Sequence, residues 1–177
     1  MLQNKIAIIT GASRGIGKSI ALTYARNGAS LVLICHKDME SLKLVKEKAE
    51  LLGAKVINLA GDIASSNFCN EIIHQTLEKF NTVDILVNCA GTITRSPVEK
   101  MSNEEWHRVI DVNLHSALYL SRNVLPIMRR KKYGKIINLT SQMAYTPHPS
   151  ASPSYEVSKS GMTALTRHLA LKYAKYN

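Results

Sequence analysis

The sequence has few cysteines, few aromatic residues and no long hydrophobic run. Only three cysteines occur among 177 residues, at positions 35, 69 and 89. They form no C-x-x-C pair and no cluster with histidine, so we expect neither a disulfide framework nor a bound metal. The longest apolar runs are far shorter than the ~20 residues that a membrane-spanning helix needs. The N-terminus carries no apolar segment with a cleavage site. We therefore expect a reduced, cytoplasmic protein with no membrane partner.

Acidic residues are also scarce. The chain has 13 Asp and Glu against 23 Lys and Arg, and residues 91–177 hold 13 of the basic side chains and only 5 of the acidic ones. Much of this excess lies in residues 129–135, RRKKYGK. Such a cluster could dock an acidic carrier protein, or it could be a helix end stopped by Gly134, where cations favour the helix dipole. We favour the helix end and leave carrier docking open. We expect no nucleic-acid partner, because no aromatic-and-basic pattern accompanies the cluster.

Short β-branched runs alternate with amphipathic segments of helical length. Strands are expected at 5–10, 31–34, 56–60, 83–87 and around 136–137, and helices at about 16–27, 39–52, 68–80, 103–130 and 155–175. The first helix is predicted to bury Ile16, Ile20, Ala21 and Tyr24 on one face. Strict alternation predicts right-handed βαβ crossovers, and so a doubly wound parallel α/β sheet. We interpret residues 1–177 as one Rossmann domain, with ligands beyond the carboxyl ends of its strands.

A glycine-rich turn, TGASRGIG, follows the first expected strand and opens the first expected helix. Gly11, Gly15 and Gly17 allow a tight turn and a close approach of the backbone to a pyrophosphate, with Ser13 and Ile16 in the same turn. Glycines alone are weak evidence. The position between strand and helix is the context that a dinucleotide-binding turn requires.

The end of the second strand indicates which dinucleotide is preferred. An acidic residue there would accept the ribose 2′-hydroxyl of NAD, but no acid occurs before Asp38. Arg14 and Lys37, with His36 beside them, are instead placed to pair with a 2′-phosphate. The sequence therefore favours NADP(H) over NAD(H).

Tyr155 and Lys159 form the strongest candidate for catalysis. They are four residues apart in an expected helix, so they share one face. A free phenol has a pKa near ~10, and a neighbouring cation stabilises the phenolate. Ser141 follows the fifth strand, where it could hydrogen-bond a substrate carbonyl. Asn113 lies in a helix of apolar neighbours, where asparagine is a poor helix former.

Together these motifs resemble the short-chain dehydrogenase/reductase (SDR) family, classical branch. They occur in the family's order: the turn at 10–17, Asp62 after the third strand, Asn88-x-Ala-Gly after the fourth, then Asn113, Ser141 and Tyr155-x-x-x-Lys. One departure is Cys89, where a second asparagine is more common. The residues expected to bind cofactor are Gly11, Ser13, Arg14, Gly15, Ile16, Gly17, His36, Lys37, Asp62, Ile63, Asn88, Ala90, Gly91, Tyr155 and Lys159.

The resemblance also implies roles for these residues. Asp62 would contact the adenine, and Asn88 would support the central strand and the cofactor. Tyr155 would be the general acid that protonates a carbonyl oxygen, while hydride passes from the nicotinamide to the carbonyl carbon. Lys159 would favour the ionised form of Tyr155 and hold the ribose hydroxyls of the nicotinamide. Ser141 would orient the carbonyl, and Asn113 would position a water that relays protons.

Within the family, the glycine turn and the basic segment most resemble 3-oxoacyl-[acyl-carrier-protein] reductases. A carrier-linked or small-molecule carbonyl is therefore the expected substrate, with an acyl carrier protein docking near Lys132. Sugars, polyols and steroids stay open as alternatives. By the same resemblance, the helices at 103–130 and 155–175 would form a homodimer or homotetramer.

Family members normally continue beyond the tyrosine helix with further strands and a substrate-covering loop. This sequence stops at Asn177, so we expect a domain that is truncated relative to the family, with the fifth strand at an open edge. A catalytically weak or silent form that binds only nucleotide or a partner subunit is the alternative.

Overall fold

Five short apolar runs form one parallel sheet in the computed structural model, which describes residues 1–176. The strands are β1 (Ile6–Thr10), β2 (Ser30–Cys35), β3 (Val56–Ala60), β4 (Ile85–Asn88) and β5 (Lys135–Asn138), in the order β3-β2-β1-β4-β5. Every residue of β1 is buried, as expected for a central strand covered on both faces. The predicted doubly wound parallel sheet is confirmed.

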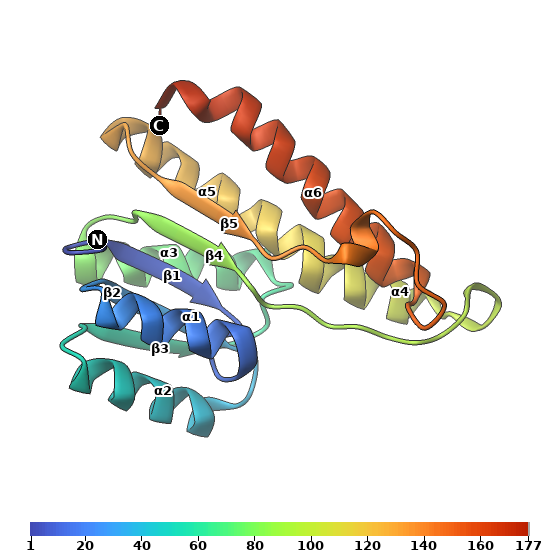
Figure 1. Cartoon of the computed structure of the whole chain (residues 1–177), viewed down its shortest axis with the longest axis horizontal. Helices are drawn as coiled ribbons and strands as arrows, with labels where there is room; N and C mark the ends of the chain where they lie inside the picture. The colour runs from blue at the N-terminus through green and yellow to red at the C-terminus, as the bar shows by residue number, and fades with distance from the viewer. Residues whose placement is uncertain (177) are drawn as a thin grey trace.

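Helices cover both faces of this sheet (Figure 1). They are α1 (Gly15–Arg26), α2 (Met39–Leu51), α3 (Ser66–Phe80), α4 (Asn103–Ile110), α5 (Ser116–Lys131) and α6 (Pro153–Tyr173). Ala7 and Ile9 of β1 pack in the same buried cluster as the inner faces of α1 and α2. Ile8 points the other way, into the cluster formed with α3 and α5. The alternation along β1 thus divides the core into two layers.

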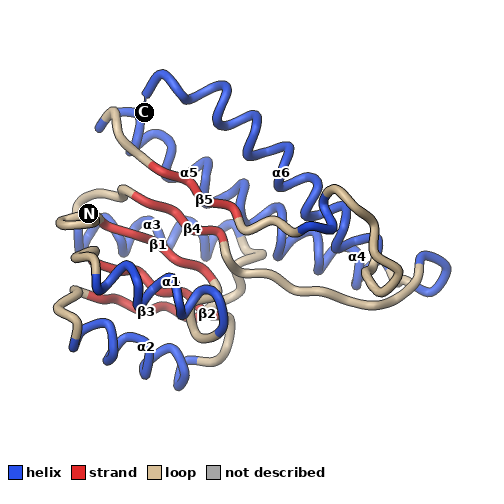
Figure 2. The backbone as a smooth tube through the Cα atoms, viewed as in Figure 1, coloured by secondary structure: helices blue, strands red, loops and turns tan. Residues whose placement is uncertain are grey.

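Long loops follow β4 and β5 and leave the sheet at the same end (Figure 2). The first leads through a short 3₁₀ helix (Val98–Lys100) into α4, and the second through another (Gln142–Ala144) into α6. Helix α6 packs against α4 and against the end of β5. The carboxyl ends of the strands therefore face these loops and the first turn of α6.

Four details differ from the sequence predictions. The helix expected over 103–130 contains a π-helical turn, Asp111–His115, between α4 and α5. Ile16 is 65% exposed rather than buried, because it faces a cleft at the start of α1. Helix α6 begins at Pro153, two residues early, because Ser152 caps it and proline suits its first turn.

The last difference concerns the end of α5. Lys132, not Gly134, takes the left-handed conformation that ends the helix, with φ of 52°. A side chain at Gly134 would overlap Met128, so this glycine serves packing instead.

Within residues 1–176, β5 pairs with β4 alone and lies at the edge of the sheet, as expected. A hollow of about 460 Å³ lies between α5, β5 and α6. In this part of the chain no helix combines the length and the apolar character needed to cross a membrane.

Candidate active site

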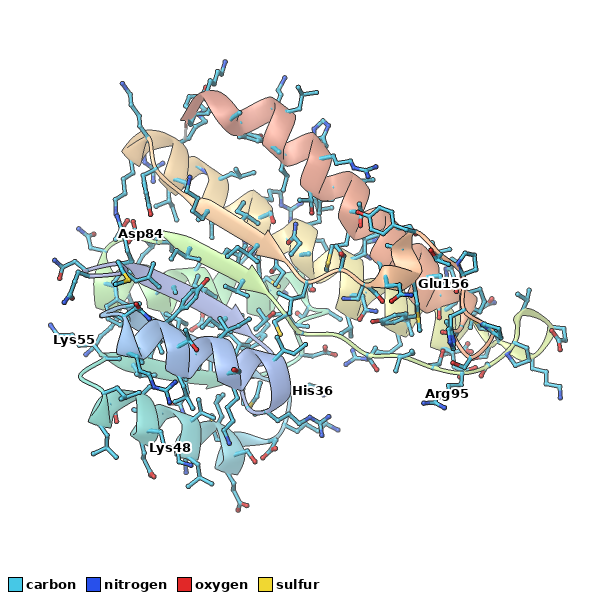
Figure 3. All side chains as sticks on the ribbon, in the orientation of Figure 1. His36, Lys48, Lys55, Asp84, Arg95 and Glu156 are labelled. Carbon is cyan, nitrogen blue, oxygen red and sulfur yellow. The ribbon has the colours of Figure 1, made fainter. Side chains whose placement is uncertain are left out.

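A cleft of about 820 Å³ opens at the carboxyl ends of the strands. Its lining comes from the turn after β1, the ends of β2, β3 and β4, the loop after β5, and helices α4 and α6. His36, which lines it, and Asp84, which lies before β4, stand at opposite ends of the sheet (Figure 3). The cleft is therefore where a parallel α/β sheet binds its ligands.

The glycine turn forms one wall of the cleft with exposed backbone. Gly11 has a φ of 68°, in the left-handed region that favours glycine. A Cβ on Gly17 would overlap the carbonyl group of Gly11, so residue 17 cannot carry a side chain. Helix α1 starts here with no side-chain cap and no acidic residue in its first turn. Its free N–H groups and dipole therefore favour an anion.

Thr10 fixes the position of the chain that faces this turn. Its buried hydroxyl accepts hydrogen bonds from the backbone N–H groups of Cys89 (3.0 Å) and Ala90 (2.9 Å). The end of β1 is thereby joined to the chain leaving β4. The sequence gives no sign of this role for Thr10, because its partners lie about eighty residues further along the chain.

The end of β2 forms a second, charged wall. Arg14, His36 and Lys37 are exposed, line the cleft and make no ion pair within residues 1–176. Asp38 also lines it, but its carboxylate caps α2 by accepting the N–H of Ser41 (3.1 Å). This wall presents a net positive charge.

Asp62, after β3, pairs with Arg108 of α4, a residue that sequence analysis missed. The guanidinium donates to the carboxylate at 2.6 Å, and the N–H of Ala64 donates to the other oxygen at 3.0 Å. Partial burial acts to raise the pKa of Asp62, but these hydrogen bonds and the positive charges of Arg108 and His36 outweigh it and lower that pKa. Asp62 is thus an ionised acceptor at neutral pH.

Asn113 lies in the π turn and is completely buried. Its amide accepts the N–H of Thr92 (2.8 Å) and donates to the carbonyl of Thr92 (2.9 Å) and to the hydroxyl of Ser158 (3.0 Å). One side chain therefore ties the loop after β4 to α6. π turns frequently occur at functional sites, and here the turn brings Asn113 to this junction.

Lys159 and Tyr155 lie at the far end of the same cleft. The Lys159 ammonium is 5.8 Å from the centre of the Tyr155 ring and donates to the carbonyl of Leu139 (2.7 Å). Lys159 is only 5% exposed, so burial lowers its pKa, with nearby Cys89 acting in the opposite direction. The Tyr155 hydroxyl makes no hydrogen bond to any described residue. A cation and an uncommitted phenol thus share one end of the cleft.

A row of amides supports this end of the cleft from below. Asn88 donates to the side chain of Asn138 (2.8 Å), which donates to the hydroxyl of Thr166 on α6 (2.8 Å). The next residue after β5, Leu139, donates its N–H to the carbonyl of Asn88 (3.0 Å). Strands β4 and β5 and helix α6 are therefore held in register beneath Lys159.

Most of the predicted site residues line the cleft, but four do not: Gly15, Asn88, Asn113 and Ser141. Asn88 and Asn113 lie behind its wall, in the hydrogen-bond networks described above. Ser141 caps the short 3₁₀ helix after β5 by accepting the N–H of Met143 (3.2 Å), while Thr140 before it lines the cleft.

No group of three or more metal-binding side chains occurs within residues 1–176.

Known proteins are similar to this chain in sequence. General stress protein 39 of Bacillus subtilis is 31% identical over 175 residues, which are 98% of this chain and 60% of the relative. The 3-oxoacyl-[acyl-carrier-protein] reductase FabG of Staphylococcus epidermidis is 34% identical over 171 residues, 97% of this chain and 70% of that protein. This chain thus spans between about three fifths and seven tenths of these relatives.

A solved structure gives the same result in three dimensions. A metagenomic short-chain oxidoreductase in complex with NADP matches with a TM-score of 0.94 at 32% identity, over 99% of this chain and 79% of that one. Residues 5–177 match the family described as short chain dehydrogenase. A glycine turn and a Tyr155–Lys159 helix meet at one cleft above a parallel sheet, and this chain belongs to the short-chain dehydrogenase family.

Proposed function

We propose that this protein is an NADP(H)-dependent reductase that converts a carbonyl, specifically a 3-oxoacyl thioester, to an alcohol. The observation that carries the proposal is a single cleft in which the uncapped start of α1 lies between the charged wall after β2 and the Tyr155–Lys159 pair of α6. Such a cleft suits a ligand that is anionic in its middle and reactive at one end.

The cleft fits a nicotinamide dinucleotide. Gly11 and Gly17 leave a backbone cradle that a Cβ would fill, and the free N–H groups of α1 would hold the pyrophosphate. Gly91 lines the cleft together with Tyr155 and Lys159, and without a side chain it would let a flat ring approach the backbone there. Bound NADPH would supply the hydride.

Tyr155 would supply the proton. Its hydroxyl is free to hydrogen-bond a substrate carbonyl, and transfer of its proton to that oxygen would complete the alcohol. The Lys159 ammonium, held by the carbonyl of Leu139, would stabilise the negative charge left on the phenol oxygen. Ser141, which does not line the cleft here, would orient the carbonyl by turning its hydroxyl from Met143 toward the substrate. Asn113 would act as a positioning residue that keeps the loop after β4 against α6.

Cofactor choice follows from the charged wall. Arg14, Lys37 and His36 are exposed and form no ion pair with any residue that the structure describes, so a 2′-phosphate would find donors without breaking one. Arg14→Ala is expected to weaken NADPH binding far more than NADH binding, with roughly tenfold or more lost for NADPH. Equal losses for the two dinucleotides would contradict this part of the proposal.

The substrate class is supported by relatives named 3-oxoacyl-[acyl-carrier-protein] reductases at 32–34% identity. Exposed cations at residues 129–132 would attract an acidic carrier, although Lys131 is already paired with Asp84. Leu118 and Val157 are 41% and 47% exposed on α5 and α6, which supports a homodimer or homotetramer through these helices. Sedimentation at monomer mass would contradict that assembly.

The test follows NADPH absorbance with acetoacetyl thioesters as substrates. Tyr155→Phe removes only the phenol oxygen and is expected to lower the rate of reduction at least about a hundredfold. Binding of NADPH, followed by energy transfer from Trp106, the sole tryptophan, should persist. Tyr133→Phe, in the turn before β5 and away from the cleft, is the matched control. Full activity in Tyr155→Phe would overturn the mechanism.

A further inference from the structure

Arg108 and Asp62 form an ion pair inside the cleft rather than behind its wall. Arg108 belongs to α4 and Asp62 follows β3, and each side chain is 42% exposed. Ion pairs at this exposure contribute little to stability. Because the pair lies within the proposed cofactor cleft, we expect it to contribute to cofactor binding instead.

Two buried apolar residues accompany the pair. Ile63 follows Asp62 and is 7% exposed, and Val112, one helical turn after Arg108, is 6% exposed. Both line the cleft, so the four residues together present an apolar surface with a polar edge. This combination suits a flat heterocycle, which needs apolar contact on its face and hydrogen bonds at its rim.

The pair retains hydrogen-bonding capacity on both sides. Each oxygen of Asp62 accepts one hydrogen bond in the structure, and a carboxylate oxygen can accept a second. Arg108 uses one N–H for Asp62 and has four more. An acceptor therefore stands directly beside a donor, 2.6 Å apart. Adenine carries the complementary pattern, a 6-amino donor next to a ring-nitrogen acceptor.

We propose that Arg108 is a specificity-determining residue for the base of the cofactor, donating to a ring nitrogen of adenine while Asp62 holds its guanidinium in place. This inference rests on the proposed dinucleotide function. It predicts that the site rejects hypoxanthine, whose 6-oxo group and N1–H reverse the order of donor and acceptor. Arg108 faces the base and takes no part in binding the 2′-phosphate.

The experiment compares the binding of NADPH and of its hypoxanthine analogue by calorimetry, with NADH titrated alongside to detect any effect on the 2′-phosphate. The unmodified chain should bind NADPH at least about fivefold more tightly. Arg108→Ala should weaken NADPH binding and bring the two affinities within about twofold of each other. Arg108→Lys keeps the charge but loses the planar fork, so it should also lose the preference. Arg26→Gln, an exposed arginine in the last turn of α1 outside the cleft, should leave both affinities unchanged.

Each outcome decides between the claims. If the unmodified chain binds NADPH and Arg108→Ala keeps the preference for adenine, this inference is wrong and the proposed function stands. If Arg108→Ala or Arg108→Lys instead loses NADPH relative to NADH with the base preference intact, Arg108 reads the 2′-phosphate and the inference is again wrong. If the unmodified chain binds neither dinucleotide, both the function and the inference fail. Arg108→Lys decides the question if Arg108→Ala does not fold.

Discussion

Replacing Asn113 by leucine tests whether this buried amide holds the active site together. Leucine has a similar size but cannot make the three hydrogen bonds to Thr92 and Ser158. The N–H and the carbonyl of Thr92 would lose their partners. The Ser158 hydroxyl would keep its bond to the carbonyl of Tyr155 (2.8 Å).

The expected cost follows from these unsatisfied groups. A buried polar group without a partner costs about 1–3 kcal/mol. Thr92 is only half-buried, so water would replace part of the hydrogen bonding that its N–H and carbonyl lose. We therefore expect Asn113→Leu to lower the free energy of unfolding by roughly 2–4 kcal/mol. For a chain of this length that corresponds to a fall in Tm of roughly 5–15 °C.

Urea unfolding with an unchanged m-value is the assay. Ser141→Ala is the comparison, because its hydroxyl caps only a three-residue 3₁₀ helix and its loss should cost less than about 1 kcal/mol. The free energy of unfolding of Asn113→Asp should lie close to that of the leucine variant, because its carboxylate would face the carbonyl of Thr92. A loss below about 1 kcal/mol in Asn113→Leu would refute the reasoning.

Three further predictions concern the cleft. Gly17→Ala would drive a methyl group into the carbonyl of Gly11, so it should cost about 1–3 kcal/mol in urea unfolding and abolish dinucleotide binding in a titration; normal binding would contradict it. Thr10→Val leaves two backbone N–H groups after β4 without an acceptor and should lower the free energy of unfolding by about 1–3 kcal/mol, whereas an unchanged urea midpoint would exclude this role. The pKa of Asp62 is lower in the folded state, so its contribution to stability is complete above the ordinary carboxyl pKa of ~3.9 and is lost as the pH falls through the folded value. Arg108→Ala should reduce this part of the pH dependence of unfolding, because the Ala64 N–H remains, and identical pH profiles for the two proteins would contradict it.

The strands and helices could be predicted because their signals are local. The apolar run of β1 and the spacing of Leu42, Val45 and Ala49 on α2 are the patterns of a buried strand and an amphipathic helix. The glycine turn and the Tyr155–Lys159 spacing are equally local, and the structure brings both to one cleft. For Ile16 the same pattern gave the wrong result, because periodicity does not distinguish an apolar residue in the core from one at the rim of a cleft.

The remaining features depend on contacts between distant parts of the chain. Arg108 meets Asp62 across 46 positions, and the Thr10 hydroxyl meets backbone groups 79 and 80 residues away. Nothing near either residue in the sequence indicates its partner. The π turn at Asn113 shifts the helical phase by one residue over five positions, which is too short for any periodic pattern to reveal.

A crystal structure of the chain with bound NADP⁺ tests the central claim most directly. We expect the pyrophosphate on the N-terminus of α1, against Gly11 and Gly17, with the nicotinamide beside the Tyr155 hydroxyl and the Lys159 ammonium. A dinucleotide bound elsewhere, or a nicotinamide ring out of reach of both side chains, would contradict the account.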